Sequence, residues 1–180
     1  MDSRTRLITT AVTLLNEEGV QAVTLRRIAR AAGVSHGAPL RHFGGRAELL
    51  SAVATEGFAE LHKRSEKLPE TDPQARLLTA CRLYLEFALA NPAMFELMFR
   101  HDLTNPDDLA ELHNEVLAWF TDLVMAAQSG GWRAGADARA LAASLWAALH
   151  GLAELWLRGG LAEAPDVDTA LGVTLSAYLG

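Results

Sequence analysis

Basic side chains recur between residues 24 and 43 in a pattern that suits contacts with a polyanion. They are Arg26, Arg27, Arg30, His36, Arg41 and His42. A guanidinium group presents a fixed fork of donors that matches phosphate and the edge of guanine, and an imidazole can donate or accept a hydrogen bond. If these side chains share one surface, they could hold both the backbone and the bases of a nucleic acid.

Capping residues in the same segment predict two short helices that would position the basic side chains. Thr24 can accept a hydrogen bond from a free amide in the first turn of a helix, and apolar residues follow it at helical spacing. Gly33 comes where a residue with positive φ would end that helix. Ser35 is expected to cap a second helix with Pro39 in its first turn. The core of this helix-turn-helix would comprise Leu25, Ile28, Val34 and Phe43.

Two small residues follow the second cap. Gly37 and Ala38 would keep the start of the second helix slim, so that its backbone could approach the floor of a DNA groove or a thymine methyl group. Arginines on a surface helix are more often simply solvated, and helix-turn-helix geometry also occurs in proteins that do not bind DNA. The order of cap, turn glycine and second cap favours the DNA-binding interpretation.

The charge of the chain is unevenly distributed. The formal net charge of the 180 residues is −6, which taken alone argues against nucleic acid. Residues 1–50, however, hold seven Arg against four acidic residues, a balance of +3 that leaves −9 for residues 51–180. A basic head on an acidic body is expected of a DNA-binding protein with a separate regulatory part.

Other classes of protein find less support in the sequence. It contains no Glu-x-x-His pair, nucleophile elbow, phosphate loop or zinc-spaced cysteine set, so we expect neither an enzyme nor a metal or cofactor site. Cys81, the single cysteine, is expected to be a buried apolar residue in a reducing cytoplasm. No signal peptide is expected, and the longest uncharged run, residues 140–153, is shorter than the roughly 20 residues of a membrane span.

Helical periodicity extends over almost the whole chain and predicts an all-α fold of about nine helices. Residues 1–47 would form a three-helix head with the helix-turn-helix, and residues 48–180 a helical body. A long helix over residues 46–68 would connect the two. The remaining helices are expected over residues 3–18 and 73–90, from Pro92, over residues 106–129 and 137–158, and from Asp166 towards the end.

Several motifs of the head resemble those of the TetR/AcrR family of bacterial transcriptional regulators. They are Glu18-Gly19, Thr24-Leu25-Arg26-Arg27-Ile28-Ala29, Ala32-Gly33-Val34-Ser35, Arg41-His42-Phe43 and Glu48-Leu49-Leu50. In the body, Trp146 with His150-Gly151 is similar to the Trp-x-x-x-His-Gly signature of one subgroup. One departure matters: where the family usually has a tyrosine that contacts the DNA backbone, this chain has Pro39-Leu40.

The resemblance implies a homodimer that binds a palindromic double-stranded DNA operator. Ser35, His36, Gly37 and Ala38 would lie at base edges or the nearest phosphates. Thr24, Arg26 and Arg46 would hold phosphates, which position the protein without specifying a sequence. Leucine cannot donate to phosphate, so the contact of the missing tyrosine would be either lost or taken over by His42 or Arg41.

The resemblance also implies a pocket for a small hydrophobic effector in the body, where Met and aromatic side chains suit an adaptable apolar cavity. The expected lining is Tyr84, Phe87, Met98, Phe99, Trp119, Phe120, Trp146 and His150. Each of these residues is more often ordinary core than the lining of a pocket. His150 and Glu154, four residues apart, could place a carboxylate against an imidazole, although such a pair is more often a satisfied core pair.

The last two helices of the family pair with those of a second subunit, which implies a four-helix dimer interface here. Its expected residues are Trp146, Leu149, Ala153, Trp156, Leu171, Leu175 and Tyr178. Ala143, Ala147 and Gly151 would permit close helix approach.

Together these expectations describe a sequence-specific transcriptional regulator. It would be a repressor that dissociates from DNA when it binds its effector. The effector would tilt the connecting helix over residues 46–68 and so change the separation of the two heads. The alternative is a helical adaptor or ligand-binding protein that does not bind DNA.

Overall fold

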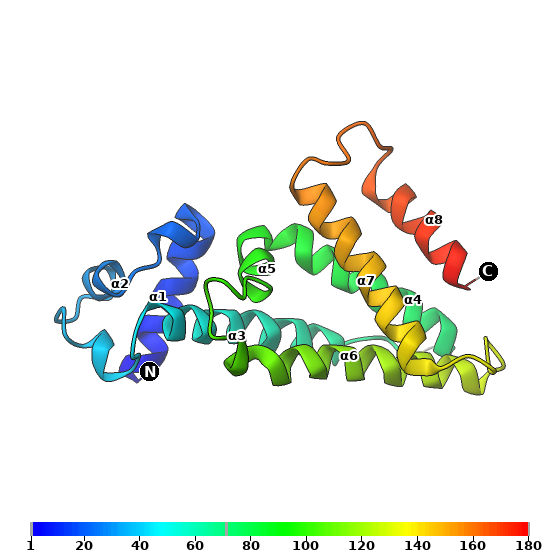
Figure 1. Ribbon diagram of the computed structural model, residues 1–180, viewed down its shortest axis with the longest axis horizontal. Helices are drawn as coiled ribbons and strands as arrows, with labels where there is room; N and C mark the ends of the chain where they lie inside the picture. The colour runs from blue at the N-terminus through cyan, green and yellow to red at the C-terminus, as the bar shows by residue number, and fades with distance from the viewer. Residues whose placement is uncertain (1, 71, 180) are drawn as a thin grey trace. The chain divides into compact units, whose positions relative to one another are not determined.

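The computed structural model describes residues 2–70 and 72–179 (Figure 1). Within these residues the chain forms eight α-helices and two short 3₁₀ helices, with no strand, which confirms the all-α fold. The chain divides into two compact units. The first comprises Met1–Glu60 and Asn91–Leu112, and the second Leu61–Ala90 and His113–Gly180.

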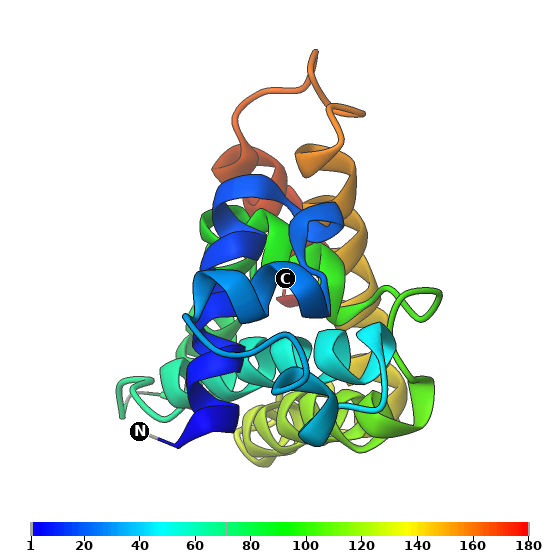
Figure 2. The same ribbon diagram turned by 90° about the vertical axis from the view of Figure 1, so that its left-hand side faces the viewer.

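The first unit contains the N-terminal helices and a later helix of the chain, α5 (Figure 2). Its elements are α1 (Ser3–Glu18), the 3₁₀ helix η1 (Val20–Ala22), α2 (Leu25–Ala31), the 3₁₀ helix η2 (Pro39–Arg41), most of α3 (Arg46–Ser65), α5 (Pro92–Met98) and the start of α6 (Pro106–Ser129).

Helix α1 has the bounds that its sequence predicts. Asp2 caps it, accepting a hydrogen bond of 2.8 Å from the amide of Thr5, and this bond lowers the pKa of the Asp2 carboxyl. Gly19 ends the helix with a φ of 79°, a conformation that glycine adopts without a steric penalty. The buried face of α1 consists of Leu7, Ile8, Ala11, Leu14 and Leu15.

Helix α5 packs against α3 within the first unit. A Cβ atom added at Gly57 of α3 would lie 2.7 Å from the Met98 sulfur and 2.8 Å from Cγ of Met94, so the two helices approach closely only because residue 57 is glycine. Phe99 lies beside this contact, with its ring centroid 6.0 Å from that of Phe58. The packing fixes α5 to the same unit as the helix-turn-helix.

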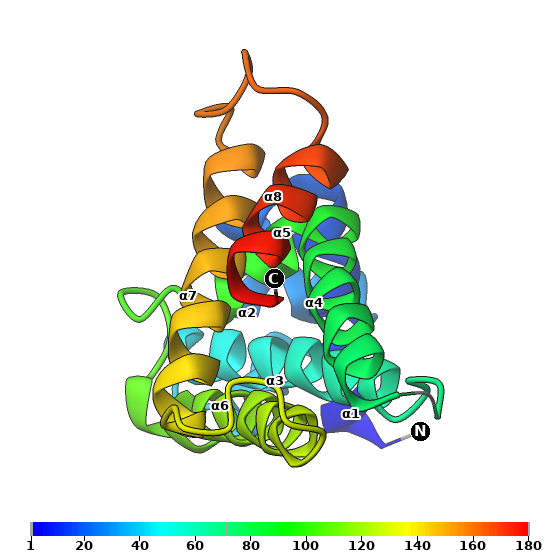
Figure 3. The same ribbon diagram turned by 90° about the vertical axis from the view of Figure 1, so that its right-hand side faces the viewer.

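The second unit holds the longer helices of the body (Figure 3). They are α4 (Pro73–Ala90), most of α6, α7 (Ala138–Leu157) and α8 (Val167–Leu179). Helix α7 packs against both α4 and α8. The three aspartates that the sequence places before these helices act as caps: Asp72, Asp137 and Asp166 accept hydrogen bonds from the amides of Ala75, Ala140 and Thr169 at 3.1, 2.7 and 2.9 Å.

Three observations bear on the expectations from the sequence. Cys81 is fully buried, as expected, and burial raises the pKa of its thiol to about 12. By its length and composition, helix α7 could cross a membrane, and 22% of its most apolar stretch is buried in the protein.

Helix α3 ends at Ser65, three residues before the predicted end at Leu68.

Candidate nucleic-acid interface

The first half of the helix-turn-helix follows the predicted geometry. Thr24 caps α2, its hydroxyl accepting a hydrogen bond of 3.3 Å from the amide of Arg27. Gly33 has a φ of 64°, as its position after the last helical turn requires. A guanidinium nitrogen of Arg6 donates to the carbonyl of Ala32 at 2.7 Å and fastens α1 to the end of α2.

The second half departs from the prediction, because no α-helix begins at Ser35. Residues 39–41 form only the 3₁₀ helix η2, which follows Ala38 without a side-chain cap. The backbone bonds run from residue i+3 to residue i, from Ala38 to Ser35 and from Arg41 to Ala38. Pro39 has no amide hydrogen with which to bond the Ser35 carbonyl in an α-helix, and Gly37 disfavours helix, so the tighter turn results.

Two apolar anchors orient the recognition segment, residues 35–43. Pro39 is buried, and the side chain of Phe43 is 1% exposed. The Arg4 guanidinium lies 5.5 Å from the centroid of the Phe43 ring, so α1 supports this anchor with a cation–π contact. Between the anchors, Leu40 and Arg41 are exposed, and Leu40 is 62% exposed.

An open hollow of about 800 Å³ lies between the end of α1, α2 and the recognition segment. It brings Thr24, Arg26 and His36 together, three of the residues that the sequence predicts to contact DNA. The remaining lining is Leu14, Glu18, Arg27, Arg30 and Ala31. Three arginines against one carboxylate give the hollow a positive charge.

The carboxylate in this hollow belongs to an ion pair that the sequence did not reveal. Glu18, at the end of α1, accepts a hydrogen bond from the Arg27 guanidinium of α2, and both side chains remain partly exposed. The two residues lie on different helices, so helical periodicity cannot relate them. The pair holds the Arg27 guanidinium at the rim of the hollow.

The Arg46 side chain takes a direction that the sequence did not predict. Its Nε donates to the carbonyl of Val23 at 2.8 Å, and a terminal nitrogen donates to the carbonyl of Val20 at 2.6 Å. These carbonyls belong to η1 and the residue after it, just before α2. Arg46 therefore fixes the loop that leads into Thr24.

The other predicted contact residues are accessible. Ser35, His36, Gly37 and Arg41 are exposed, and Ala38 and His42 are partly exposed. All of them lie on the recognition segment, so one surface can present them together.

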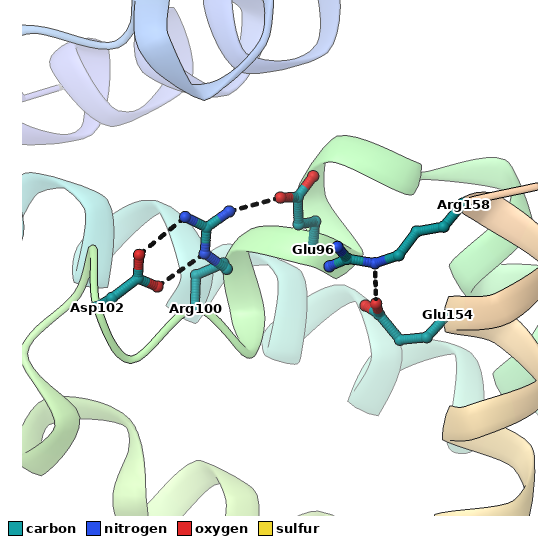
Figure 4. A network of polar contacts seen from close by, with 5 residues as sticks. All are labelled: Glu96, Arg100, Asp102, Glu154 and Arg158. Atoms are coloured by element: carbon teal, nitrogen blue, oxygen red, sulfur yellow. Dashed lines mark hydrogen bonds and ion pairs between the residues drawn. The ribbon is translucent and has the colours of Figure 1, made fainter.

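A second charged cluster of the first unit follows α5 (Figure 4). Arg100 donates two hydrogen bonds to the Asp102 carboxylate, at 2.7 and 2.8 Å, and one of 2.7 Å to Glu96. The bonds from Arg100 lower the pKa of Asp102. Since all three donated bonds end on neighbouring residues of the chain, the cluster braces the turn after α5.

In the second unit, the structure brings together three of the residues predicted to line an effector pocket. The Tyr84 hydroxyl lies 3.1 Å from Nδ1 of His150, and the ring centroids of Tyr84 and Phe120 are 5.9 Å apart. Burial raises the pKa of the Tyr84 hydroxyl and lowers the pKa of His150. The cluster can therefore offer a neutral polar group within apolar surroundings.

The remaining residues predicted for that pocket are divided between the two units. The Arg64 guanidinium lies 5.4 Å from the centroid of the Phe87 ring. The ring centroids of Trp119 and Phe120 are 4.7 Å apart. Trp146 is partly buried. Met98 and Phe99 belong to the first unit, where both contact α3.

The carboxylate predicted to face His150 has another partner. Glu154 accepts a hydrogen bond of 2.6 Å from Nε of Arg158, four residues further along α7 (Figure 4). Burial lowers the pKa of His150, and the negative charge of Glu154 partly offsets this effect by raising it.

Two models of known families match the chain. Residues 7–53 match the bacterial regulatory proteins of the tetR family, and residues 77–178 match the tetracyclin repressor-like C-terminal domain. The second match alone covers more than half of the chain. The chain belongs to the tetR family. The resemblance of the motifs between Glu18 and Leu50 is thereby confirmed.

Curated relatives of this tetR-family chain include proteins with different names. The nucleoid occlusion factor SlmA of Actinobacillus pleuropneumoniae serotype 5b is 33% identical over 117 residues, which cover 61% of the chain and 55% of that relative. The chain thus spans about half the length of this relative. The HTH-type transcriptional regulator TtgR of Pseudomonas putida is 28% identical over 171 residues, which cover 87% of the chain and 80% of TtgR.

The fold as a whole also occurs among solved structures. A protein of unknown function from Rhodococcus sp. RHA1 matches with a TM-score of 0.83 and 29% sequence identity. The match covers 100% of the chain and 97% of the Rhodococcus chain. This single match therefore includes both the N-terminal and the C-terminal regions of the chain that match the family models.

The residues expected at a dimer interface differ in their exposure within one protomer. Leu149 and Ala153 of α7 and Leu171 and Leu175 of α8 are at most 3% exposed within one protomer. These four side chains therefore belong to the core of the protomer and have almost no surface left to bury against a second copy. Trp146, Trp156 and Tyr178 remain partly exposed.

The opposite faces of the same two helices stay uncovered. On α7, Ala143 and Ala147 are exposed and Leu155 is 52% exposed. On α8, Val173 is 69% exposed. Small residues with two large apolar side chains are typical of a surface against which other helices pack closely.

Proposed function

We propose that this chain is a transcriptional regulator that binds a palindromic operator as a homodimer and is released by a small hydrophobic effector. The observation that carries the proposal is the positively charged hollow at the helix-turn-helix, where Thr24, Arg26 and His36 share one surface. Membership of a family of bacterial regulatory proteins and the similarity to the transcriptional regulator TtgR support the regulatory part. Such a protein acts where the chromosome is, in the cytoplasm.

In this proposal the residues of the recognition segment contact the major groove. Ser35, His36, Gly37, Ala38 and Arg41 lie at base edges, because they are accessible and precede or form η2. Thr24, Arg26 and His42 bind phosphates. Arg46 acts on the loop before Thr24 instead, since its guanidinium already donates to two carbonyls there.

The body supplies the dimer contact and the effector site. The uncovered faces of α7 and α8, with Ala143, Ala147, Leu155 and Val173, form the dimer interface. Tyr84 and His150 provide the polar anchor of the effector site among aromatic side chains. By this division residues 1–47 are the DNA-binding domain and residues 48–180 the regulatory domain.

An electrophoretic mobility shift tests the DNA-binding part. The probe is the DNA upstream of the protein's own coding sequence, with random DNA as competitor, at two salt concentrations. Arg26→Ala should weaken binding to both DNAs alike and lower the slope of log affinity against log salt by about one unit. Arg82→Ala, an exposed arginine on α4 of the second unit, is the matched control and should bind as the unaltered protein does.

A DNA-binding regulator and a helical adaptor would give different results in the same assay. A specific complex with the upstream fragment, dissociated by extracts that contain a hydrophobic effector, supports the proposal. If no fragment forms a specific complex at either salt concentration, the chain is an adaptor or ligand-binding protein and the proposal is overturned.

A further inference from the structure

We propose that Leu40 determines part of the operator sequence by contacting the C5-methyl group of a thymine in the major groove. This inference rests on the proposed DNA-binding function. The starting observation is that Leu40 is 62% exposed, although it lies in the middle of the recognition segment. Among the residues that the structure describes, the other large apolar side chains that stand out as exposed are Met125, Leu155 and Val173, all in the second unit.

The exposure of Leu40 follows from the local fold. Pro39 is buried directly before it, and Phe43 is anchored three residues after it under the Arg4 guanidinium. The 3₁₀ bonds that follow, including the 3.0 Å bond from the His42 amide to the Pro39 carbonyl, fix the backbone between these anchors. With both flanking anchors turned inward, the Leu40 side chain is held on the outer surface.

The surroundings of Leu40 indicate what it contacts. Leu40 lines an open hollow of about 430 Å³ together with Leu25, Arg26 and His36. Arg41, the next residue, is also exposed. An apolar side chain amid cationic groups fits an occupant that carries negative charge next to an apolar group. The DNA major groove offers this combination, because phosphates border it and thymine alone among the four bases presents a methyl group there.

A phosphate contact does not explain the leucine. Its side chain has no donor, so it adds nothing to the binding of the backbone, which Arg26 and Thr24 can supply. Burying one methyl group against an apolar side chain is worth about 0.8 kcal/mol, which corresponds to about a fourfold change in affinity. Leu40 should therefore favour thymine over a base without the methyl group by about fourfold.

The experiment replaces thymine by deoxyuracil, which pairs identically but lacks the C5-methyl group. Binding sites are first selected from random double-stranded DNA with the full chain, and each thymine of the selected site is then exchanged singly. The dissociation constants are measured for the unaltered chain, for Leu40→Ala and for Leu40→Met. Because Leu40 is exposed, neither variant should perturb folding, which circular dichroism checks.

We expect one thymine in each half-site whose exchange weakens binding of the unaltered chain about fourfold. Leu40→Ala should bind both versions of that site equally, and Leu40→Met, which keeps an apolar side chain of similar size, should retain the preference. If selection yields a specific site but no exchange matters, or if Leu40→Ala keeps the full preference, the thymine contact is overturned while the DNA-binding function stands. If no specific site can be selected, the proposed function itself fails.

Discussion

The phenolic oxygen of Tyr84 on α4 lies 3.1 Å from Nδ1 of His150 on α7. Both side chains belong to the second unit, Tyr84 fully buried and His150 partly so. Burial lowers the pKa of His150, a nearby His113 lowers it further, and Glu154 opposes both effects. The folded protein therefore favours the neutral imidazole at a pH where an unfolded chain begins to protonate it.

This relationship predicts a stability that depends on His150 between neutral and mildly acid pH. The folded pKa lies below the ordinary value of 6.5, so the contribution of His150 is complete above pH 6.5 and is lost as the pH falls through the folded pKa. The free energy of unfolding, determined by urea denaturation at intervals from pH 8 to pH 5, measures this contribution. His150→Gln should flatten this dependence, because the amide does not titrate in this range. An equal pH dependence in His150→Gln and the unaltered protein would contradict the prediction.

A second prediction concerns the close approach of α3 and α5. Gly57→Ala places a Cβ atom 2.7 to 2.9 Å from atoms of Met94 and Met98, so the helices must move apart or the methionines must change rotamer. We expect a loss of about 1 to 3 kcal/mol in the free energy of unfolding. Chemical denaturation measures it. In the double variant Gly57→Ala/Met94→Ala, the total loss should be smaller than the sum of the single losses, because the clash is relieved. Strictly additive losses would argue against the contact.

Features of the fold that depend on neighbouring residues were predictable from the sequence. The caps at Thr24, Asp137 and Asp166 and the positive φ of Gly33 follow from local hydrogen bonding and sterics. The α-helix expected from Ser35 was wrong for a reason that is also local, since Pro39 removes an amide four residues after the expected cap.

Features that depend on distant residues were not predictable. Helical periodicity shows that Leu149 and Leu171 lie on apolar faces, but it cannot show whether the protomer or a second copy covers them. The association of α5 with the helix-turn-helix unit likewise depends on Gly57, some 40 residues from Met94 and Met98 in the sequence. The carbonyl partners of the Arg46 guanidinium likewise carry no signal in the sequence.

A third prediction separates the roles of Arg46 and Arg26. Arg46→Ala removes two charge-assisted hydrogen bonds to the carbonyls of Val20 and Val23, so it should lower the free energy of unfolding by about 1.5 to 3 kcal/mol. DNA binding should weaken with an unchanged salt slope, whereas Arg26→Ala should reduce that slope by about one unit at unchanged stability. Fluorescence anisotropy at several salt concentrations, combined with denaturation, distinguishes the two. A reduced slope at full stability in Arg46→Ala would instead make Arg46 a phosphate ligand.

The last prediction concerns the proposed dimer interface on the uncovered faces of α7 and α8. Leu155→Glu places a charge on a surface that a second copy would cover, and a buried unpaired carboxylate opposes association strongly. Light scattering after size-exclusion chromatography should report a monomer for this variant, and its affinity for a palindromic site should fall because two half-sites are no longer bound together. Met125→Glu makes the same change at a 56% exposed side chain on α6 and should remain dimeric. If Leu155→Glu stays dimeric and binds DNA normally, the subunits associate through another surface, and the faces that carry Ala147 and Val173 must have a different role.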